Sequence, residues 1–371
     1  MTRRLFSFIF FVFCTFSSIK VFAQNYEIDI PEGFDLIDTD DDGKGFMFFS
    51  SSALTYCVIR ESSEYKSAQQ ALSSSIEKLK ARASVKNIFW DYKNCAITKS
   101  FSIVMNNAAK TGRAAAIPMN GTKDILIVIC FGEKTALSEA ICDSIVDSIS
   151  VDRGGKFCAG IVTSLLYPKG EEKEIALEIE GKKINTAIDE NAEKAEQYVI
   201  DREFEIMKSF VSSPRWKEAW IRYYQQLYRV AYFYLQRSAF DIATALYEND
   251  TQFAKSILSW VQYFDYEHEE TGSDYTGATR AIQTKKNDCD SRSVILAAIL
   301  NQAAIPSTIF VSREYAHMIA GVNLKDAGFK MQGATSDFYL TAETTSRGLS
   351  LGKMLAETAD RSKWIDVNLP R

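Results

Sequence analysis

The chain has 371 residues, of which 46% are hydrophobic and 25% are charged, and its formal net charge is −5. This length is enough for two domains with separate cores, and the composition is that of a globular protein rather than a disordered one. The weak negative charge gives no reason to expect a nucleic acid as a partner.

The N-terminus has the pattern of a secretory signal. Arg3 and Arg4 precede an apolar run over residues 5–16, and the small residue Ala23 follows. This order of basic, apolar and small residues is typical of a signal peptide, here residues 1–23. An uncleaved membrane anchor is the alternative, although the apolar run is shorter than a bilayer span requires. We therefore expect an exported protein, with the periplasm as its compartment.

The cysteines give no unique disulfide pattern. Six of the seven lie after the predicted signal, and five of those six precede residue 160, namely Cys57, Cys95, Cys130, Cys142 and Cys158. Several of them stand in apolar, strand-like runs, so buried free thiols explain the pattern as well as one or two disulfides would. The sequence leaves both alternatives open.

Residues 24–150 are predicted to form one domain. Strand-like runs alternate with polar turns, and apolar positions at helical spacing predict helices over about 67–82 and 134–150. The Asp-rich run 38–43 is expected to be a turn rather than a calcium loop, because Phe49 stands where such a loop needs a glutamate. Strands in a meander with helices at both ends indicate an α+β sandwich.

This first domain resembles the PsbP/Mog1-like domains. The resemblance rests on Ile-Pro-Glu-Gly at residues 30–33, on an Asp-Ser-Ile motif near the end of the segment, and on the order of its elements. It implies a domain that binds or positions a partner, for example another protein of the cell envelope, rather than one that carries chemistry.

Residues 151–371 are predicted to form a second domain, which begins with a connecting segment and a helical segment. Residues 151–185 contain a charged hairpin, and the pattern is helical for most of residues 187–253. One stripe of large side chains recurs three and four residues apart, through Trp216, Trp220, Tyr223, Leu227 and Val230. Such a stripe is more often core than a ligand site.

The strongest chemical signal in the chain is a thiol at a predicted helix start. Asn287 or Asp288 can cap a helix that begins near Cys289 and continues as an apolar, buried run. Three strand-like segments follow, and two of them carry a histidine and an acid, His317 and Glu343. A helix N-terminus lowers the pKa of a thiol, an imidazole can take its proton, and a carboxylate can orient that imidazole.

These residues resemble the transglutaminase-like superfamily of cysteine enzymes. The matching passages are Asn-Asp-Cys-Asp at 287–290 with its helix, His-Met-Ile-Ala-Gly-Val at 317–322, and Glu-Thr-Thr at 343–345. Trp-Val-Gln at 260–262 also fits, and the resemblance covers about residues 253–355. It implies a papain-like α+β domain with Cys289 as the nucleophile, His317 as the general base and Glu343 as the orienting acid.

Three positions leave the assignment open in detail. Asn287 replaces the usual glycine of the motif, and Asp337 competes with Glu343 because an aspartate is common elsewhere in the superfamily. Gln262 is a candidate donor to an oxyanion, beside the backbone N–H of Cys289. Its alternative is an ordinary helix hydrogen bond.

The sequence therefore predicts an α+β protein in which an antiparallel-sheet sandwich precedes a helical segment and a transglutaminase-like domain. The predicted activity is acyl transfer at an amide through a thioester, with hydrolysis of a peptide or isopeptide bond as the leading outcome. Transamidation uses the same triad and stays open, as does a non-catalytic envelope protein with a vestigial triad. No cofactor is expected, and two histidines are too few for a histidine-based zinc site.

Overall fold

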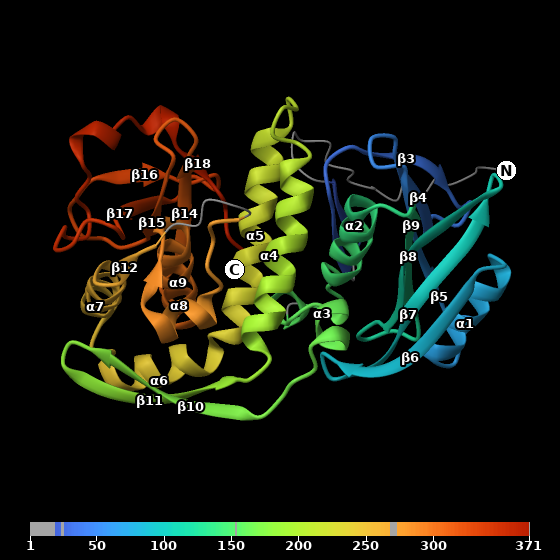
Figure 1. The fold of residues 1–371 in the computed structure, drawn as a ribbon, viewed down its shortest axis with the longest axis horizontal. Helices are drawn as coiled ribbons and strands as arrows, with labels where there is room; N and C mark the ends of the chain where they lie inside the picture. The colour runs from blue at the N-terminus through green and yellow to red at the C-terminus, as the bar shows by residue number, and fades with distance from the viewer. Residues whose placement is uncertain (1–18, 24–25, 153, 268–272, 371) are drawn as a thin grey trace, which may run out of the picture. The chain divides into compact units, whose positions relative to one another are not determined.

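The computed structural model describes residues 19–23 (backbone only), 26–152, 154–267 and 273–370. The α+β class is confirmed, because helices and antiparallel sheets both contribute to the fold (Figure 1). The chain divides into two compact units. The first unit runs through residue 156 and includes residues 160–162 and 209–219, whereas the second unit contains the remainder.

The first unit is built on a seven-stranded antiparallel sheet with the strand order β3-β4-β5-β9-β8-β7-β6. Its strands are β3 (Phe34–Thr39), β4 (Gly45–Ser50), β5 (Thr55–Ser62), β6 (Arg82–Trp90), β7 (Lys93–Met105), β8 (Ala108–Pro118) and β9 (Ile125–Gly132). Every residue of the central strand β9 is buried, which explains why its sequence is apolar without alternation.

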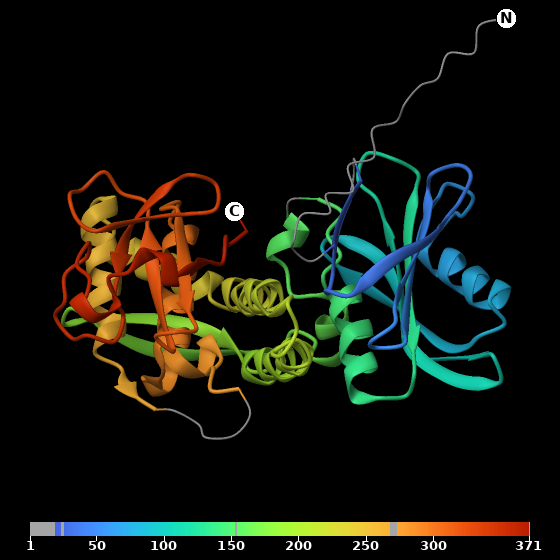
Figure 2. The same cartoon turned by 90° about the horizontal axis from the view of Figure 1, so that it is seen from above.

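Two helices cover opposite faces of this sheet (Figure 1, Figure 2). Helix α1 (Ala68–Lys78) packs on the face lined by Ile127 and Ile129, and the side chain of Ser67 caps it by accepting a hydrogen bond from the Gln70 N–H. Helix α2 (Ala136–Asp147) lies on the other face. Burial on both faces gives this sheet a core on each side.

Helix α1 is shorter than its sequence pattern predicted. The helix ends at Lys78 instead of continuing to residue 82, and Lys80 adopts a left-handed backbone conformation. The following residues, from Arg82, pair with β7 in the sheet. Tertiary strand pairing therefore overrides the local helical pattern at this point.

The predicted signal peptide falls mostly on residues 1–18, which lie outside the described residues. The backbone of β1 (Ile19–Ala23) pairs antiparallel with β2 (Tyr26–Ile30). Among the helices of the described ranges, none combines the length and the apolar composition needed to cross a bilayer.

The second unit contains a five-stranded antiparallel sheet with the order β16-β17-β15-β14-β18. Its strands are β14 (Ser307–Ser312), β15 (His317–Val322), β16 (Lys330–Gln332), β17 (Phe338–Ala342) and β18 (Ile365–Asp366). A hairpin, β10 (Glu172–Ile179) and β11 (Lys182–Asp189), and a short parallel pair, β12 (Asp265–Tyr266) and β13 (Lys286–Asn287), complete its strands among the described residues.

The sheet of the second unit packs against a buried central helix, α9 (Cys289–Gln302). Residues 291–300 of α9 are all buried, because strands β14 and β15 lie on one side and other helices surround the rest. The other helices are α3 (Ile161–Leu166), which belongs partly to the first unit, α4 (Ala192–Lys208), α5 (Trp216–Tyr234), α6 (Gln236–Leu246), α7 (Asp250–Gln262) and α8 (Ala278–Thr284). A helix that is apolar all round can hold a side chain at its first residue in a fixed place.

Candidate active site

Cys289 is the first residue of the buried helix α9. Asp288 caps the helix, and its carboxylate accepts hydrogen bonds from the backbone N–H and the hydroxyl of Ser291 at 3.0 and 2.9 Å. The helix start and the cap therefore lie where the sequence predicted them. The Cys289 side chain is 7% exposed, so the thiol is near the surface but largely enclosed.

His317 and Glu343 are brought together by two neighbouring strands. His317 opens β15 and Glu343 follows the last residue of β17, and these strands pair through Ala320 and Ala342. His317 Nε2 lies 2.9 Å from Glu343 Oε2. Since a carboxylate only accepts, Nε2 carries the proton and Nδ1, the ring nitrogen nearer the backbone, is left as the acceptor.

Glu343 is held as an anion despite its burial. Burial raises the pKa of this carboxyl, but the hydrogen bond from His317 and two hydrogen bonds from Thr345 lower the pKa below its ordinary value. The Thr345 backbone N–H and hydroxyl reach Glu343 Oε1 at 2.9 and 2.7 Å. One carboxylate oxygen is thus fixed by the chain, and the other is directed at the imidazole.

Asp337, the competing acid, is placed elsewhere. It precedes β17, and its Oδ2 accepts a hydrogen bond from the Thr335 hydroxyl at 3.1 Å. Between the two acids considered from the sequence, Glu343 is the one that contacts the imidazole.

The thiol lies beside the backbone that follows His317, but its side-chain partner is Asp290. Cys289 Sγ donates to Asp290 Oδ1 at 3.1 Å, and the Met318 backbone N–H faces the sulfur. Helix α9 packs on β15, and the Ser293 hydroxyl donates to the Met318 carbonyl at 3.5 Å. The thiol and the imidazole therefore belong to two elements in direct contact.

The sequence-based expectation of a lowered thiol pKa does not fit this environment. Burial raises the pKa of Cys289 far above its ordinary value, and the nearby carboxylates of Asp290 and Asp288 raise it further. The Met318 N–H opposes this rise but does not cancel it. The resting thiol is thus protonated, because desolvation and two negative neighbours outweigh the helix N-terminus.

Gln262 does not have the free donor that an oxyanion role requires. Its Nε2 donates to the carbonyls of Glu343 and Leu349 at 2.8 and 2.9 Å, and its Oε1 accepts from the Gly348 N–H at 3.2 Å. With both amide hydrogens used on backbone carbonyls, the side chain holds the loop that carries Glu343. These partners belong to residues 343–349 and not to helix α7, so the bonds are not the helix hydrogen bond that was the alternative.

Arg292 is a positioning residue that the sequence reasoning missed. It is fully buried and donates to Asn287 Oδ1 and to the Phe264 carbonyl at 2.8 Å each, and to the Thr344 carbonyl at 3.4 Å. One guanidinium therefore connects the segment before the thiol to the loop after Glu343. An arginine in an otherwise apolar helix, three residues after the cysteine, was the signal available. Asn287, which replaces the usual glycine, is fully buried and receives one of these bonds.

The ligand atoms of Asp288, Cys289 and Asp290 lie within 4.8 Å of one another, close enough in principle to hold a cation. Two of these side chains have structural partners, because Asp288 caps α9 and Asp290 accepts from the Tyr224 hydroxyl. A metal there would occupy the sulfur, so a metal site and a thiol nucleophile exclude each other.

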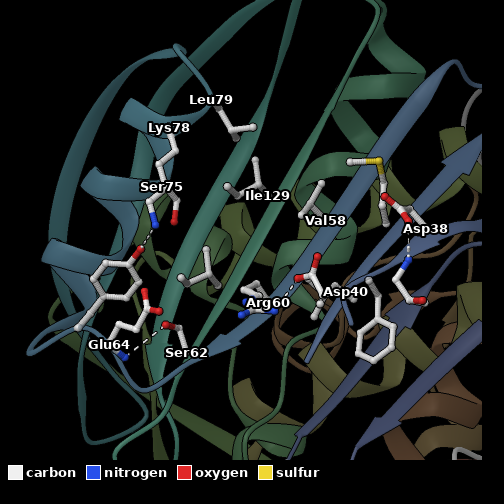
Figure 3. Close-up of a pocket in the computed structure, with 17 residues that line it drawn as sticks. Asp38, Asp40, Val58, Arg60, Ser62, Glu64, Ser75, Lys78, Leu79 and Ile129 are labelled. Carbon is white, nitrogen blue, oxygen red and sulfur yellow. Dashed lines mark hydrogen bonds and ion pairs between the residues drawn. The ribbon is translucent and has the colours of Figure 1, made fainter. Parts of the chain in front are cut away.

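A separate cavity of about 480 Å³ lies within the first unit, between β4, β5, β9 and α1. Figure 3 shows apolar side chains such as Val58 and Ile129 on its floor, with Arg60 reaching Asp40 and Lys78 projecting from α1. Arg60 also binds Asp42 at 2.8 Å. The Asp-rich run thus forms the turn between β3 and β4 and neutralises an arginine.

Comparisons with known proteins give a fold likeness for the N-terminal part of the chain. No family model and no curated protein matches the sequence. The solved structure of the Ran-binding protein Mog1p of Saccharomyces cerevisiae is 9% identical, has a TM-score of 0.28, and covers 36% of this chain and 94% of its own. The solution structure of cyanobacterial PsbP from Synechocystis is 12% identical and has a TM-score of 0.30. It covers 37% of this chain and 94% of its own.

The N-terminal part is thus similar to Mog1 and PsbP, as the sequence predicted. A Bacteroides thetaiotaomicron protein covers more of this chain, 55%, and 74% of its own, at 10% identity and a TM-score of 0.24.

Proposed function

We propose that this protein is an exported thiol enzyme, similar to the transglutaminase-like superfamily, that transfers the acyl group of an amide by way of Cys289. One observation carries the proposal. His317 on β15 and Glu343, which directly follows β17, lie 2.9 Å apart, and β15 packs against the helix whose first residue is Cys289. A thiol, an imidazole with a free nitrogen and an orienting carboxylate are the groups that acyl transfer requires.

The proposed mechanism follows from which atoms are free. His317 Nδ1 takes the proton of Cys289, and the sulfur attacks the amide carbon to form a tetrahedral oxyanion. First-turn N–H groups of α9, including that of Cys289, have no intrahelical partner and can stabilise it. Collapse of this intermediate breaks the C–N bond, and the imidazolium returns its proton to the leaving amine. Water, deprotonated by the same imidazole, then hydrolyses the thioester.

Glu343 acts through His317 in this scheme. Its carboxylate fixes the imidazole orientation and stabilises the imidazolium that forms transiently. Gln262 and Arg292 act one step further away, since they donate to the backbone carbonyls of Glu343 and Thr344.

Transamidation differs only in the second half, where an amine instead of water resolves the thioester. A non-catalytic envelope protein is a separate candidate, and the enclosed thiol beside two carboxylates is the feature that favours it. Its N-terminal domain would then bind the partner. The two classes predict different reactivities for Cys289.

The test is alkylation of Cys289 by iodoacetamide at several pH values, followed by mass spectrometry of its peptide. We expect His317→Ala to lower the rate at pH 7 by about tenfold or more, in the range that a general base contributes. Cys158, which is half-buried, is an internal reference whose rate should not change. Equal Cys289 rates in wild type and His317→Ala would favour the non-catalytic class.

A further inference from the structure

The side chain that contacts the nucleophile is an acid that the proposed mechanism does not use. Asp290 Oδ1 accepts the thiol hydrogen at 3.1 Å, and Oδ2 accepts from the hydroxyl of Tyr224 on α5. Tyr224 is buried and fixed, so it holds the carboxylate against the sulfur. Asp290 is half-buried, whereas the neighbouring Asp288 is buried and engaged as the helix cap.

Burial raises the pKa of Asp290, and the charge of Asp274 raises it further, whereas the hydrogen bond from Tyr224 and the nearby His317 lower it. Burial also raises the pKa of Asp288. Arg292, the nearest arginine in sequence, directs its donors to Asn287, Phe264 and Thr344. The carboxyl group next to the thiol is therefore partly accessible, and a cation that binds it favours its anionic form.

We propose that Asp290 is a specificity residue that binds an ammonium group adjoining the scissile carbonyl of the substrate, as at the free N-terminus of a peptide. This inference rests on the proposed acyl transfer and names its substrate class. In it, the bound ammonium takes the place of the thiol as the donor to Asp290, and the thiol is released to His317.

The chemistry of the donors supports this exchange. An S–H group is a weak donor, whereas an ammonium forms a short, charge-assisted bond with a carboxylate. The positive charge also offsets the field that keeps the sulfur protonated, so substrate binding and activation of the nucleophile occur together. Without a cation, Asp290 competes with His317 for the thiol hydrogen, and the thiol reacts more slowly.

The distances are consistent with an amino-terminal residue. Standard bond lengths place an α-ammonium nitrogen about 2.5 Å from the carbonyl carbon of its own residue. A near-attack carbonyl lies about 3–3.5 Å from the sulfur. A carboxylate oxygen 3.1 Å from the same sulfur is thus within reach of the ammonium while the carbonyl faces the thiol.

The test uses two affinity reagents, alanine chloromethyl ketone and its N-acetyl derivative, on the full-length protein at pH 6.5. At this pH an α-amino group is protonated. Alkylation of Cys289 is followed by mass spectrometry, and each rate is divided by the rate with glutathione. We expect the free-amine reagent to be favoured by about tenfold or more in wild type, as one buried charge–charge contact can provide, and by less than threefold in Asp290→Asn.

The control is Asp265→Asn, which removes one negative charge at an exposed position of β12 that contacts Arg347. It should keep the wild-type preference. Should Asp290→Asn fail to fold, Tyr224→Phe keeps the charge but releases its support, and an intermediate preference is expected.

A normalised preference below twofold in wild type would overturn the inference, as would an undiminished preference in Asp290→Asn. The proposed function has a different failure, namely rates with both reagents that do not fall in His317→Ala. Failure of both reagents to modify Cys289 in the folded protein would overturn both proposals, because a substrate could not reach the thiol either.

Discussion

The thiols of the two units have contrasting surroundings. In the first unit Cys57 and Cys130 face each other on β5 and β9, and Cys130 also meets Cys142 of α2, all of them buried. Burial raises the pKa of Cys130 well above its ordinary value, and its thiol neighbours add to this. The pKa of Cys289 is also raised, but the neighbours of this thiol are carboxylates and β15, the strand that begins with His317.

Burial alone therefore does not distinguish a core thiol from the proposed nucleophile. The six cysteines in the described residues are all free thiols, so the alternative of disulfides is not realised in this structure. The two kinds of thiol differ in their neighbours. In the first unit these neighbours are other thiols, whereas in the second unit Cys289 has two candidate proton acceptors nearby, Asp290 and His317. The predictions below test this contrast, beginning with the largest expected effect.

The sharpest test replaces one cysteine of each kind by alanine. Cys289→Ala should abolish covalent trapping by chloromethyl ketones, while Cys130→Ala should leave trapping unchanged. Because Cys130 is fully buried in a packed core, its replacement should instead cost about 1–2 kcal/mol of unfolding free energy. Mass spectrometry and urea denaturation measure the two outcomes. Trapping at any other cysteine in Cys289→Ala would contradict the contrast.

The second test concerns arginines. Arg292→Leu should lower the unfolding free energy by about 3–5 kcal/mol, because its buried acceptors lose their donor. In the first unit, Arg60→Leu breaks a half-exposed pair with Asp42 and should cost about 1 kcal/mol or less. Urea denaturation followed by tryptophan fluorescence compares them. Similar losses for both variants would show that Arg292 does not organise the site.

The third test uses pH. Burial raises the pKa of Glu196 on α4 to about 8, above the ordinary value of 4.5 for a glutamate side chain. The folded state therefore binds more protons than the unfolded state between these values, so stability falls as pH rises from about 4.5 to about 8. Glu196→Gln should remove this loss of stability. The difference in unfolding free energy between the variant and wild type should shift in favour of the variant by on the order of a few kcal/mol from pH 5 to pH 9.

The matched control for that titration is Glu193→Gln, an exposed residue of the same helix that pairs with Arg280. It should leave the pH dependence as in wild type. Urea midpoints at pH 5, 7 and 9 provide the measurement, and a Glu196→Gln curve parallel to wild type would refute the assignment.

The smallest effect is expected for a helix cap in the first unit. Ser67→Ala removes the hydrogen bond to the Gln70 N–H and should cost about 1 kcal/mol. Thermal unfolding measures it, and trapping of Cys289 should not change. Altered trapping would mean that the first unit influences the site.

Much of the local structure could be predicted from sequence. The cap at Asp288, the start of α9 at Cys289 and the start of β15 at His317 all lie where the pattern put them. Less of the site could be predicted. Gln262 was a candidate oxyanion donor, but its amide hydrogens are used on backbone carbonyls, and Arg292 and Asp290 were passed over. Gln262 and Arg292 bond residues that are distant in the sequence, and for Asp290 the direction of its side chain decides the contact. Neither feature follows from a local sequence pattern.

The α+β class, the order thiol, imidazole, acid, and the starts of α9 and β15 follow from the amino-acid sequence alone, whereas Glu343 lies just beyond the strand that was expected to carry it. Such features depend on propensities, caps and periodicities that act within a few residues. Tertiary packing alone decided that Glu343 rather than Asp337 binds His317, and that the thiol donates to Asp290. It also decided that the pKa of Cys289 rises, because desolvation depends on what the rest of the fold places around the sulfur.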